Sequence, residues 1–578
     1  MVKKKRTTKK KIKKTAKATS KKTVRKTKTV QKTKKRKSRA KSKAKAITSK
    51  AILLILDGWG VDKPNRGNAI HLAKTPTIDG LAKKHPSTKL YAHGKYVGLP
   101  SKQVGNSEAG HMNIGAGRVV KQDAVMINES IKNGTFFKNT AFKEAFNHVK
   151  KNKSKLHIIG MLSNGMSPHS DTCHIEALLK MTRKEGLYDN VYVHAFTDGR
   201  DSPQHEALKL INCLERDMCK WGCYIPERKN NGSKNGKVKV KIATVMGRFY
   251  AMDRNKKWER TKEAYEAMVY GKARTAQNAS TAIVESYNRN ETDEFIKPYV
   301  LDKKGLISDN DAVIFFNLRS DRARQLVKVF VQKNFQKRNP KSFTRKRMLK
   351  NLRFVAMTDF GPDLDHVLTA YPSIDIPKTL PLVLDHKLKQ CYIAESEKYA
   401  HVTYFFNGGY PGRVNGEDQI MIHSPNVKSY DETPPMKSFE LTKRVLKDLS
   451  KNKYDLTVLN FAAPDMVAHT GNLKASIKCC EDIDACVKKI VDAYLKKNGT
   501  VIITSDHGNI EGLINLKTWE VDTEHSTCQV PFILVNKQNR KSKLRSKGSL
   551  SDIAPTILDL FGTKKPALMT GKSLLKKR

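Results

Sequence analysis

The sequence has few of the features that mark secreted, disulfide-stabilised or membrane-spanning proteins. It contains nine cysteines, an odd number, and no Cys-x-x-Cys pair, so neither a disulfide framework nor a zinc knuckle is indicated. It also lacks an apolar run long enough to cross a bilayer. We therefore expect a soluble protein of a reducing compartment, cytoplasmic and without a membrane span.

Acidic and aromatic residues are absent from residues 1–50, which contain 25 Lys or Arg. Such a segment cannot bury enough apolar surface to fold, and it has neither the apolar centre of a signal peptide nor the Arg-rich amphipathic pattern of a transit peptide. We predict a disordered tail here. Its charge suits polyanions, so nucleic acid binding with nuclear or nucleoid association is one hypothesis. A solubilising tail without a dedicated partner is the other.

Three apolar runs typical of buried parallel strands each lead to a carboxylate. These carboxylates are Asp57, Asp465 and Asp506. Because the carboxyl ends of parallel strands meet at one edge of an open α/β sheet, where ligands bind, we expect the three side chains to lie close together.

Histidines accompany these carboxylates. His469 follows Asp465 at the i, i+4 spacing that places both on one face of a helix, His507 follows Asp506 directly, and His525 lies in a further acidic segment. Carboxylates and imidazoles together suit zinc or manganese, and their number is sufficient for two ions.

A glycine-rich stretch, residues 104–118, contains a single serine, Ser107. Its glycines permit tight turns and the close approach of an oxyanion to the hydroxyl. A serine needs a base or a metal ion to act as a nucleophile at neutral pH, and the predicted metal ligands would supply that activation. The alternative is a surface loop whose serine caps a helix that begins near Glu108.

These motifs resemble those of the cofactor-independent phosphoglycerate mutases, a family of the alkaline phosphatase superfamily. The resemblance is carried by residues 56–60, 105–113, 460–471 and 505–509, and it extends from about residue 51 to residue 575. It implies an isomerase that interconverts 3-phosphoglycerate and 2-phosphoglycerate through a phosphoserine, in glycolysis and gluconeogenesis.

The resemblance also implies a residue set for each of two manganese ions, with Co²⁺ or Mg²⁺ as alternatives. One set is Asp465, His469 and His525, and the other is Asp57, Ser107, Asp506 and His507.

The same resemblance implies the residues that act on phosphoglycerate. Ser107, Asp201 and Lys398 are expected to be catalytic: Asp201 moves protons on the glycerate hydroxyls, and Lys398 neutralises charge on the transferring phosphoryl group. The expected substrate-binding set is His169, Arg200, Asp201, Arg248, Arg254, Arg319, Arg322 and Lys398. The segment around His169 departs from the family pattern by an insertion, so His174 is the alternative for the substrate-binding imidazole.

The order of the motifs predicts the architecture. Metal-binding motifs lie before about residue 121 and after about residue 372, while the arginine motifs lie between. We therefore predict an α/β fold in which an alkaline-phosphatase-like metal-binding domain (51–121 and 372–578) is interrupted by an α/β phosphotransferase domain (122–371). Residues 119–123 and 369–377 are candidate hinges, residues 221–241 read as a polar insertion, and a monomer is expected.

Two other functions compete with this interpretation. A metal-dependent phosphatase or phosphopentomutase could share the fold, but it has no need for the four arginines at residues 248, 254, 319 and 322. A nucleic-acid-associated protein, in which the tail is the working part, is supported by the tail alone.

Overall fold

The computed structural model describes residues 47–165, 167–187, 189–221, 240–373, 375–384, 386, 388–538 and 542–576. The predicted tail, apart from residues 47–50, and most of the predicted polar insertion lie outside these ranges. Within the ranges, none of the helices combines the length and the apolarity that a membrane crossing requires.

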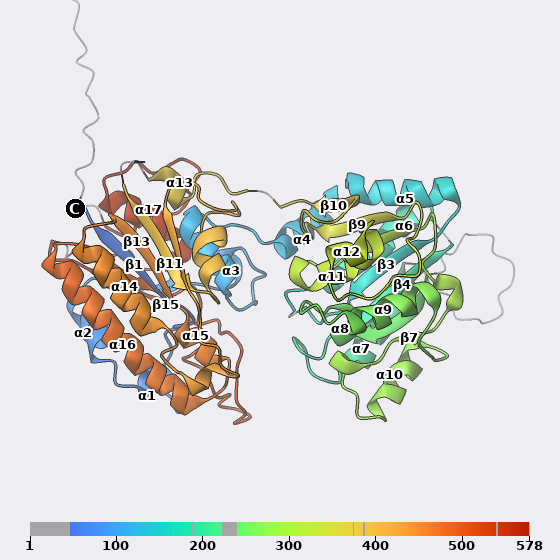
Figure 1. Cartoon of the computed structure of the whole chain (residues 1–578), viewed down its shortest axis with the longest axis horizontal. Coiled ribbons are helices and arrows are strands. Elements are labelled where there is room, and N and C mark those ends of the chain that lie inside the picture. Colours follow the sequence, from blue (N-terminus) through green and yellow to red (C-terminus); the bar gives the residue numbers. More distant parts are fainter. Residues whose placement is uncertain are drawn as a thin grey trace, which may run out of the picture. The chain divides into compact units, whose positions relative to one another are not determined.

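Two sheets of eight strands each organise the described chain (Figure 1). The first, in the order of strand pairing, consists of β12 (Asp418–Ile422), β11 (Gln390–Glu395), β13 (Leu456–Phe461), β1 (Ala51–Leu56), β14 (Thr500–Thr504), β15 (Val530–Val535), β2 (Ser87–Tyr91) and β16 (Gly548–Ser549). Its pairs are parallel except those of β15 with β14 and β2.

The second sheet has one antiparallel pair, between β5 and β7, and is otherwise parallel. In pairing order it consists of β10 (Val367–Tyr371), β9 (Arg353–Thr358), β8 (Ala312–Phe315), β3 (Leu156–Met161), β4 (Val191–Thr197), β5 (Val240–Gly247), β7 (Tyr299–Val300) and β6 (Arg274–Thr275). The α/β class predicted from the sequence is confirmed.

Helices cover both faces of the first sheet and form a separate hydrophobic core with each face. One core contains α1 (Ala69–Leu72), α2 (Pro76–Lys84), α14 (Ser438–Ser450), α15 (Ala463–Ala468) and α16 (Leu473–Lys496). The other contains α3 (Ser107–Ala116), α13 (Leu380–Val383) and α17 (Ile553–Leu560).

The second sheet is covered in the same way. One core contains α4 (Asp123–Asn133), α5 (Thr140–Asn152), α6 (Thr172–Lys184), α7 (Ala207–Lys220) and α10 (Ala279–Tyr287). The other contains α8 (Arg248–Ala251), α9 (Trp258–Tyr270), α11 (Ser320–Val331) and α12 (Phe335–Arg338). Both faces of each sheet are buried, so the central strands are largely apolar. Their few polar side chains have partners inside the core, as His157 of β3 and His194 of β4 show with a ring contact of 3.0 Å between Nδ1 and Nε2.

Three neighbouring parallel strands, β13, β1 and β14, lead to the predicted metal-binding carboxylates, and β11, beside β13, leads to Lys398. Leu56 at the end of β1 pairs with Phe461 at the end of β13, so the segments after both strands leave the sheet at the same edge. The strands of the first sheet come from residues 51–91 and 390–549, and those of the second from residues 156–371. The domain boundaries given above stay a prediction.

At two glycines, helix α3 lies so close to neighbouring backbone that a larger residue would not fit. A Cβ atom on Gly110 would lie 2.6 Å from the carbonyl oxygen of Asp506, and one on Gly115 would overlap the carbonyl oxygen of Phe406. Phe406 directly follows a π-helical turn, η5 (His401–Phe405), in the segment after Lys398. The two glycines therefore let the two halves of α3 pack against the segments that follow β14 and β11.

Glu395, the last residue of β11, is a fully buried carboxyl group. Its Oε1 accepts a hydrogen bond of 3.0 Å from the backbone N–H of Lys437. Burial raises the pKa of Glu395 to about 7, because the ionised form loses its hydration.

This raised pKa makes the stability of the fold depend on pH. The folded protein binds a proton at Glu395 more tightly than the unfolded chain does, so its contribution is fully present below pH 4.5 and is lost as the pH rises through 7. Urea unfolding in the presence of a chelator should show this loss, on the order of 3 kcal/mol between pH 4.5 and 7.5. Glu395→Gln should remove most of it, and an unchanged pH dependence would show that Glu395 is ionised in the folded state.

Candidate active site

The three carboxylates predicted to converge do so at the edge where β1, β13 and β14 end. Asp57 follows β1 directly, Asp506 lies two residues after β14, and Asp465 lies in α15; each is at most 1% exposed. Lys398, after β11, contacts two of them: its Nζ lies 2.6 Å from Asp57 Oδ1 and 2.6 Å from Asp465 Oδ2. A buried cation thus partly compensates a concentration of buried negative charge.

The charge of Lys398 is strongly favoured. Burial disfavours the ammonium form, but the carboxylates of Asp465 and Asp57 outweigh burial and raise the pKa of Lys398 above its ordinary value. Burial also opposes ionisation of Asp465, yet Lys398 holds the pKa of that carboxyl well below its usual range. Lys398 is therefore a fixed positive charge and not a general base.

Ser107 is the first residue of α3, with its Oγ among these groups. Lys398 Nζ donates a hydrogen bond of 2.7 Å to Oγ, His507 Nε2 lies 2.9 Å from it, and the hydroxyl lies 3.3 Å from Asp57 Oδ1. Asn106 caps α3 by accepting from the backbone N–H of Ala109. The positive end of the helix dipole therefore adds to the field around Ser107, which favours an anion at this position.

Two imidazole nitrogens face each other without a proton between them. His469 Nδ1 lies 2.8 Å from the carbonyl of Thr523 and His525 Nδ1 lies 2.8 Å from that of Gly105, and because carbonyls only accept, both Nδ1 atoms donate. In the neutral rings both Nε2 atoms are then acceptors, although they are only 3.1 Å apart. Each also lies 3.3–3.4 Å from Asp465 Oδ1. This set of lone pairs fits a bound cation.

A second set surrounds His507, which is fully buried. Its Nε2 lies 3.5 Å from Asp57 Oδ1 and 3.6 Å from Asp506 Oδ2. Burial disfavours the imidazolium, but Asp506 and Asp57 outweigh it and raise the pKa of His507 to about 9. Potential ligand atoms of Asp57, Asp506 and His507 all lie within 4.8 Å of one another, as do those of Asp465, His507 and His525. The residues present fit two divalent cations.

Three residues that were not predicted to belong to the site orient these ligands. Asn460 Nδ2 donates to Asp57 Oδ2 at 2.6 Å, and Asn509 Nδ2 donates to Asp465 Oδ1 at 2.8 Å. His111 Nδ1 lies 2.9 Å from the carbonyl of Ser107, to which it donates, so it fixes the first turn of α3. All three residues lie inside the motifs that carry the family resemblance. Their contacts with the carboxylates and with α3 could be identified only once the fold was known.

The predicted substrate-binding residues include a buried cluster after β4 and β5. Arg248 Nη1 donates to Asp198 Oδ1 and to Asp201 Oδ2, both at 2.6 Å. Asp201 Oδ2 also accepts from Ser167 Oγ at 2.9 Å and lies 3.8 Å from His169 Nε2. Burial opposes ionisation of Asp201, but Arg248 outweighs it and lowers the pKa of this carboxyl.

The remaining arginines differ in their partners. Arg254 and Arg319 contact Asp321, Arg319 also contacts Glu108 at 2.9 Å, and Arg200 lies 3.7 Å from Glu294. Arg322 forms no ion pair with any carboxylate of the described residues. Burial and the positive charges of neighbouring guanidiniums lower the pKa of Arg322 to about 10, so an anion here would be strongly attracted.

His174 does not contact this cluster. Its Nε2 lies 2.9 Å from Asn128 Oδ1, on the side of α6 that faces α4. The structure thus brings His169, and not His174, close to Asp201.

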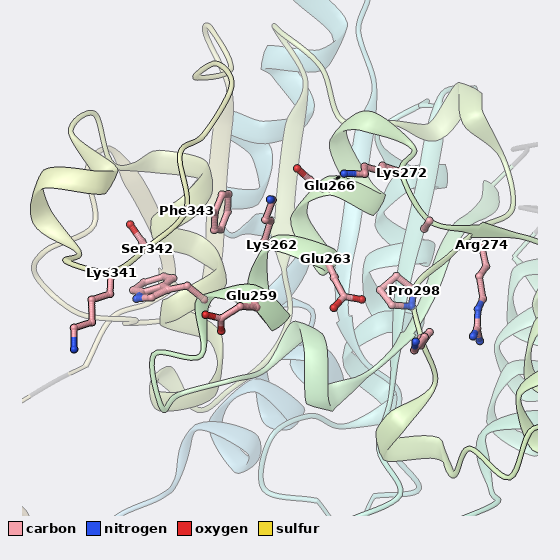
Figure 2. Close-up of a pocket in the computed structure, with 13 residues that line it drawn as sticks. Glu259, Lys262, Glu263, Glu266, Lys272, Arg274, Pro298, Lys341, Ser342 and Phe343 are labelled. Atoms are coloured by element: carbon pink, nitrogen blue, oxygen red, sulfur yellow. Dashed lines mark ion pairs between the residues drawn. The ribbon is translucent and has the colours of Figure 1, made fainter.

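A separate cavity of about 560 Å³ lies against α9 (Figure 2). Glu259 and Glu263 of α9 lie between Lys341 and Arg274 in this view, and Glu266 forms an ion pair with Lys272. None of the residues predicted to act on substrate or metal lines this cavity.

Comparisons with known proteins agree with one another over most of the chain. The sequence profile of the metalloenzyme superfamily matches residues 49–565. A curated 2,3-bisphosphoglycerate-independent phosphoglycerate mutase of Clostridium kluyveri is 45% identical over 530 residues, which are 91% of this chain and 99% of that protein. A relative from Methanosarcina acetivorans, named 2,3-bisphosphoglycerate-independent phosphoglycerate mutase 1, is 46% identical over 533 residues, 91% of this chain and 98% of that protein.

A solved structure extends this likeness to the fold. The crystal structure of Leishmania mexicana phosphoglycerate mutase at low cobalt concentration has a TM-score of 0.72 and 28% identity, and the match covers 92% of this chain and 98% of that chain. A divalent metal centre at the edge of the first sheet therefore agrees with the family profile and with the geometry.

The facing imidazoles lead to a test of metal binding. His525→Ala removes one of the two facing lone pairs, so divalent metal should bind at least about tenfold more weakly. Metal content after dialysis, measured by elemental analysis, should fall. His423→Ala, which changes an exposed histidine after β12, is the matched control and should leave the content unchanged. Equal retention in both variants would contradict the assignment.

Proposed function

We propose that this chain, which belongs to the 2,3-bisphosphoglycerate-independent phosphoglycerate mutases of the metalloenzyme superfamily, interconverts 3-phosphoglycerate and 2-phosphoglycerate through a phosphoserine at Ser107. The observation that carries the proposal is the convergence of Lys398, His507 and Asp57 on the Oγ of Ser107. The Ser107 hydroxyl is the one group at this edge that combines a nucleophilic oxygen with such activation.

We propose that two Mn²⁺ ions serve the reaction, with the ligand sets that the sequence predicts. Asp465, His469 and His525 would hold one ion, and Asp57, Ser107, Asp506 and His507 would hold the other. When bound, such ions lower the pKa of a coordinated hydroxyl and withdraw charge from phosphate oxygens.

The protein groups around Ser107 have separate tasks. Lys398 donates to Oγ and carries a fixed charge, so it stabilises the alkoxide and then the oxygens of the transferring phosphoryl group. The N-terminus of α3 favours the phosphoserine dianion that follows. Attack of Oγ on phosphorus breaks the bond to the glycerate oxygen, and glycerate remains bound until its other hydroxyl takes the phosphoryl group back.

The cluster around Arg248 acts on the glycerate. Asp201 is ionised, so its Oδ2 can accept the proton of one glycerate hydroxyl and return a proton to the other. Arg322, which lacks a carboxylate partner among the described residues, is suited to hold the substrate carboxylate or phosphate. Guanidinium groups bind such oxygens through two donors, which fixes orientation as well as position.

The remaining features follow from this reaction. We propose that residues 51–121 with 372–578 and residues 122–371 act as two domains that enclose glycerate, because an intermediate that escaped would be lost as a hydrolysis product. A monomer in the cytoplasm is the simplest form of such an enzyme.

A phosphatase on the same fold is the alternative that the arginine cluster disfavours. A phosphatase releases glycerate to water and has no need to hold and turn it. Product analysis distinguishes the two, since a mutase converts one phosphoglycerate isomer into the other with little free phosphate.

The phosphoserine is tested by Ser107→Ala. This change should reduce mutase turnover roughly a thousandfold or more, because it removes the hydroxyl that is proposed to accept the phosphoryl group. Labelled phosphate from substrate should no longer attach to the protein, while metal content at Asp465, His469 and His525 stays the same. The exposed Ser101→Ala is the control and should keep both activity and labelling. Residual turnover of a few per cent in Ser107→Ala would exclude the phosphoserine route.

We also propose that residues 1–46 bind polyanions and take no part in catalysis. The observation is their charge: the first 50 residues contain 25 Lys or Arg and no acid. Deleting residues 1–46 should leave turnover nearly unchanged and abolish retention on labelled duplex DNA at low salt, and the binding of the full chain should weaken steeply as salt rises. Equal duplex binding by both proteins would assign the effect to the rest of the basic surface.

A further inference from the structure

A second cluster of metal-ligating side chains lies where α6 begins and contacts α4. Asp171 caps α6 by accepting from the backbone N–H of Cys173, and His174 follows directly. Asn128 of α4 completes the cluster: its Nδ2 donates to Asp171 Oδ2 at 2.9 Å, which directs its Oδ1 toward the other two residues. Potential ligand atoms of Asp171, Cys173 and His174 all lie within 4.8 Å of one another.

The protons available do not satisfy these contacts. Cys173 Sγ lies 2.9 Å from Asp171 Oδ1 and 3.0 Å from Asn128 Oδ1, and both oxygens are acceptors. A thiol has a single proton, so one of the two short contacts brings lone pairs together. His174 Nε2 lies 2.9 Å from the same Asn128 oxygen, and its buried Nδ1 has no hydrogen-bond partner among the described residues. A cation in place of the thiol proton would satisfy the sulfur and both oxygens.

The ligand types select the cation. A thiolate and an imidazole favour a borderline-soft divalent metal over Mg²⁺ or Ca²⁺, and four ligands suit the tetrahedral preference of Zn²⁺. The thiolate of Cys173 and the carboxylate of Asp171 together carry two negative charges. A divalent ion therefore yields a neutral centre, which a partly buried position tolerates better than a charged one.

We propose that Asp171, Cys173 and His174, with Asn128 as the fourth ligand, form a Zn²⁺ site distinct from the metal centre around Ser107. Binding displaces the proton of the Cys173 thiol to solvent, and the proton of His174 moves to Nδ1 so that Nε2 can bind the metal. Burial and the charge of Asp171 raise the pKa of Cys173 to about 12, so the metal, and not the ambient pH, brings about this ionisation.

The position of the site implies that a bound metal would restrain helix α4. Its ligands come from two helices, and α4 begins at Asp123, the last residue of the first candidate hinge. A metal that joins Asn128 to the first turn of α6 would fix α4 on the second sheet at the point where the chain enters that sheet's helices. A metal-binding role would also account for the buried position of His174 beside Asn128, away from the substrate-binding cluster.

Cobalt spectroscopy separates this site from the one around Ser107. The full-length protein is stripped of metal and titrated with Co²⁺, which replaces Zn²⁺ and gives a thiolate-to-cobalt absorption band only when a cysteine sulfur is a ligand. The ligands around Ser107 include no cysteine. We expect the band in the unmodified protein, its loss when Zn²⁺ is added, and its absence in Cys173→Ser. Cys213→Ser, in α7, is the matched control and should keep the band.

A second variant keeps the test decisive if Cys173→Ser does not fold. If Cys173→Ser loses the circular dichroism of the unmodified protein, His174→Gln keeps the thiol and should weaken cobalt binding at the band at least tenfold. Absence of a thiolate band in the unmodified protein would overturn the proposal. So would a band of equal intensity in Cys173→Ser, because the thiolate would then belong to another cysteine.

Discussion

Three carboxylates buried within one sheet edge are the constraint on which this structure depends. An unpaired buried carboxylate costs several kcal/mol, so Asp57, Asp465 and Asp506 require cations around them. Lys398 contacts two of the three and remains charged because of them. Divalent ions would supply the positive charge that the single ammonium of Lys398 does not. Ser107, the proposed nucleophile, lies where these charges meet, so the folding requirement and the chemical requirement of the proposed reaction coincide.

The second sheet presents the opposite sign of charge. Arg248 is neutralised by Asp198 and Asp201, whereas Arg322 has guanidinium neighbours and forms no ion pair with a carboxylate in the part of the chain that the structure describes. The carboxylate or phosphate of the proposed substrate would supply an anion to Arg322. The end of the first sheet therefore gathers acids, which suit cations, and the second sheet gathers arginines, which suit an anion.

The sequence predicts most of the site because strand ends are easy to recognise. Asp57 and Asp506 follow apolar runs that read as buried strands, and parallel pairing brings the ends of such strands to one edge. The sequence did not identify the residues that orient these carboxylates. Asn460 and Asn509 are neutral, so no charge pattern marks them, and only the hydrogen bonds in the structure show their role. The spacing around an insertion left the choice between His169 and His174 open, and only packing placed the latter beside α4.

One hydrogen bond links the metal centre to the backbone that carries the nucleophile. His525 Nδ1 donates to the carbonyl of Gly105, two residues before Ser107, while its Nε2 faces the proposed ion. The imidazole is rigid, so an ion of a different radius at Nε2 would move Nδ1 and, with it, the carbonyl of Gly105. The orientation of the Ser107 hydroxyl would therefore depend on the radius of the bound ion as well as on its Lewis acidity.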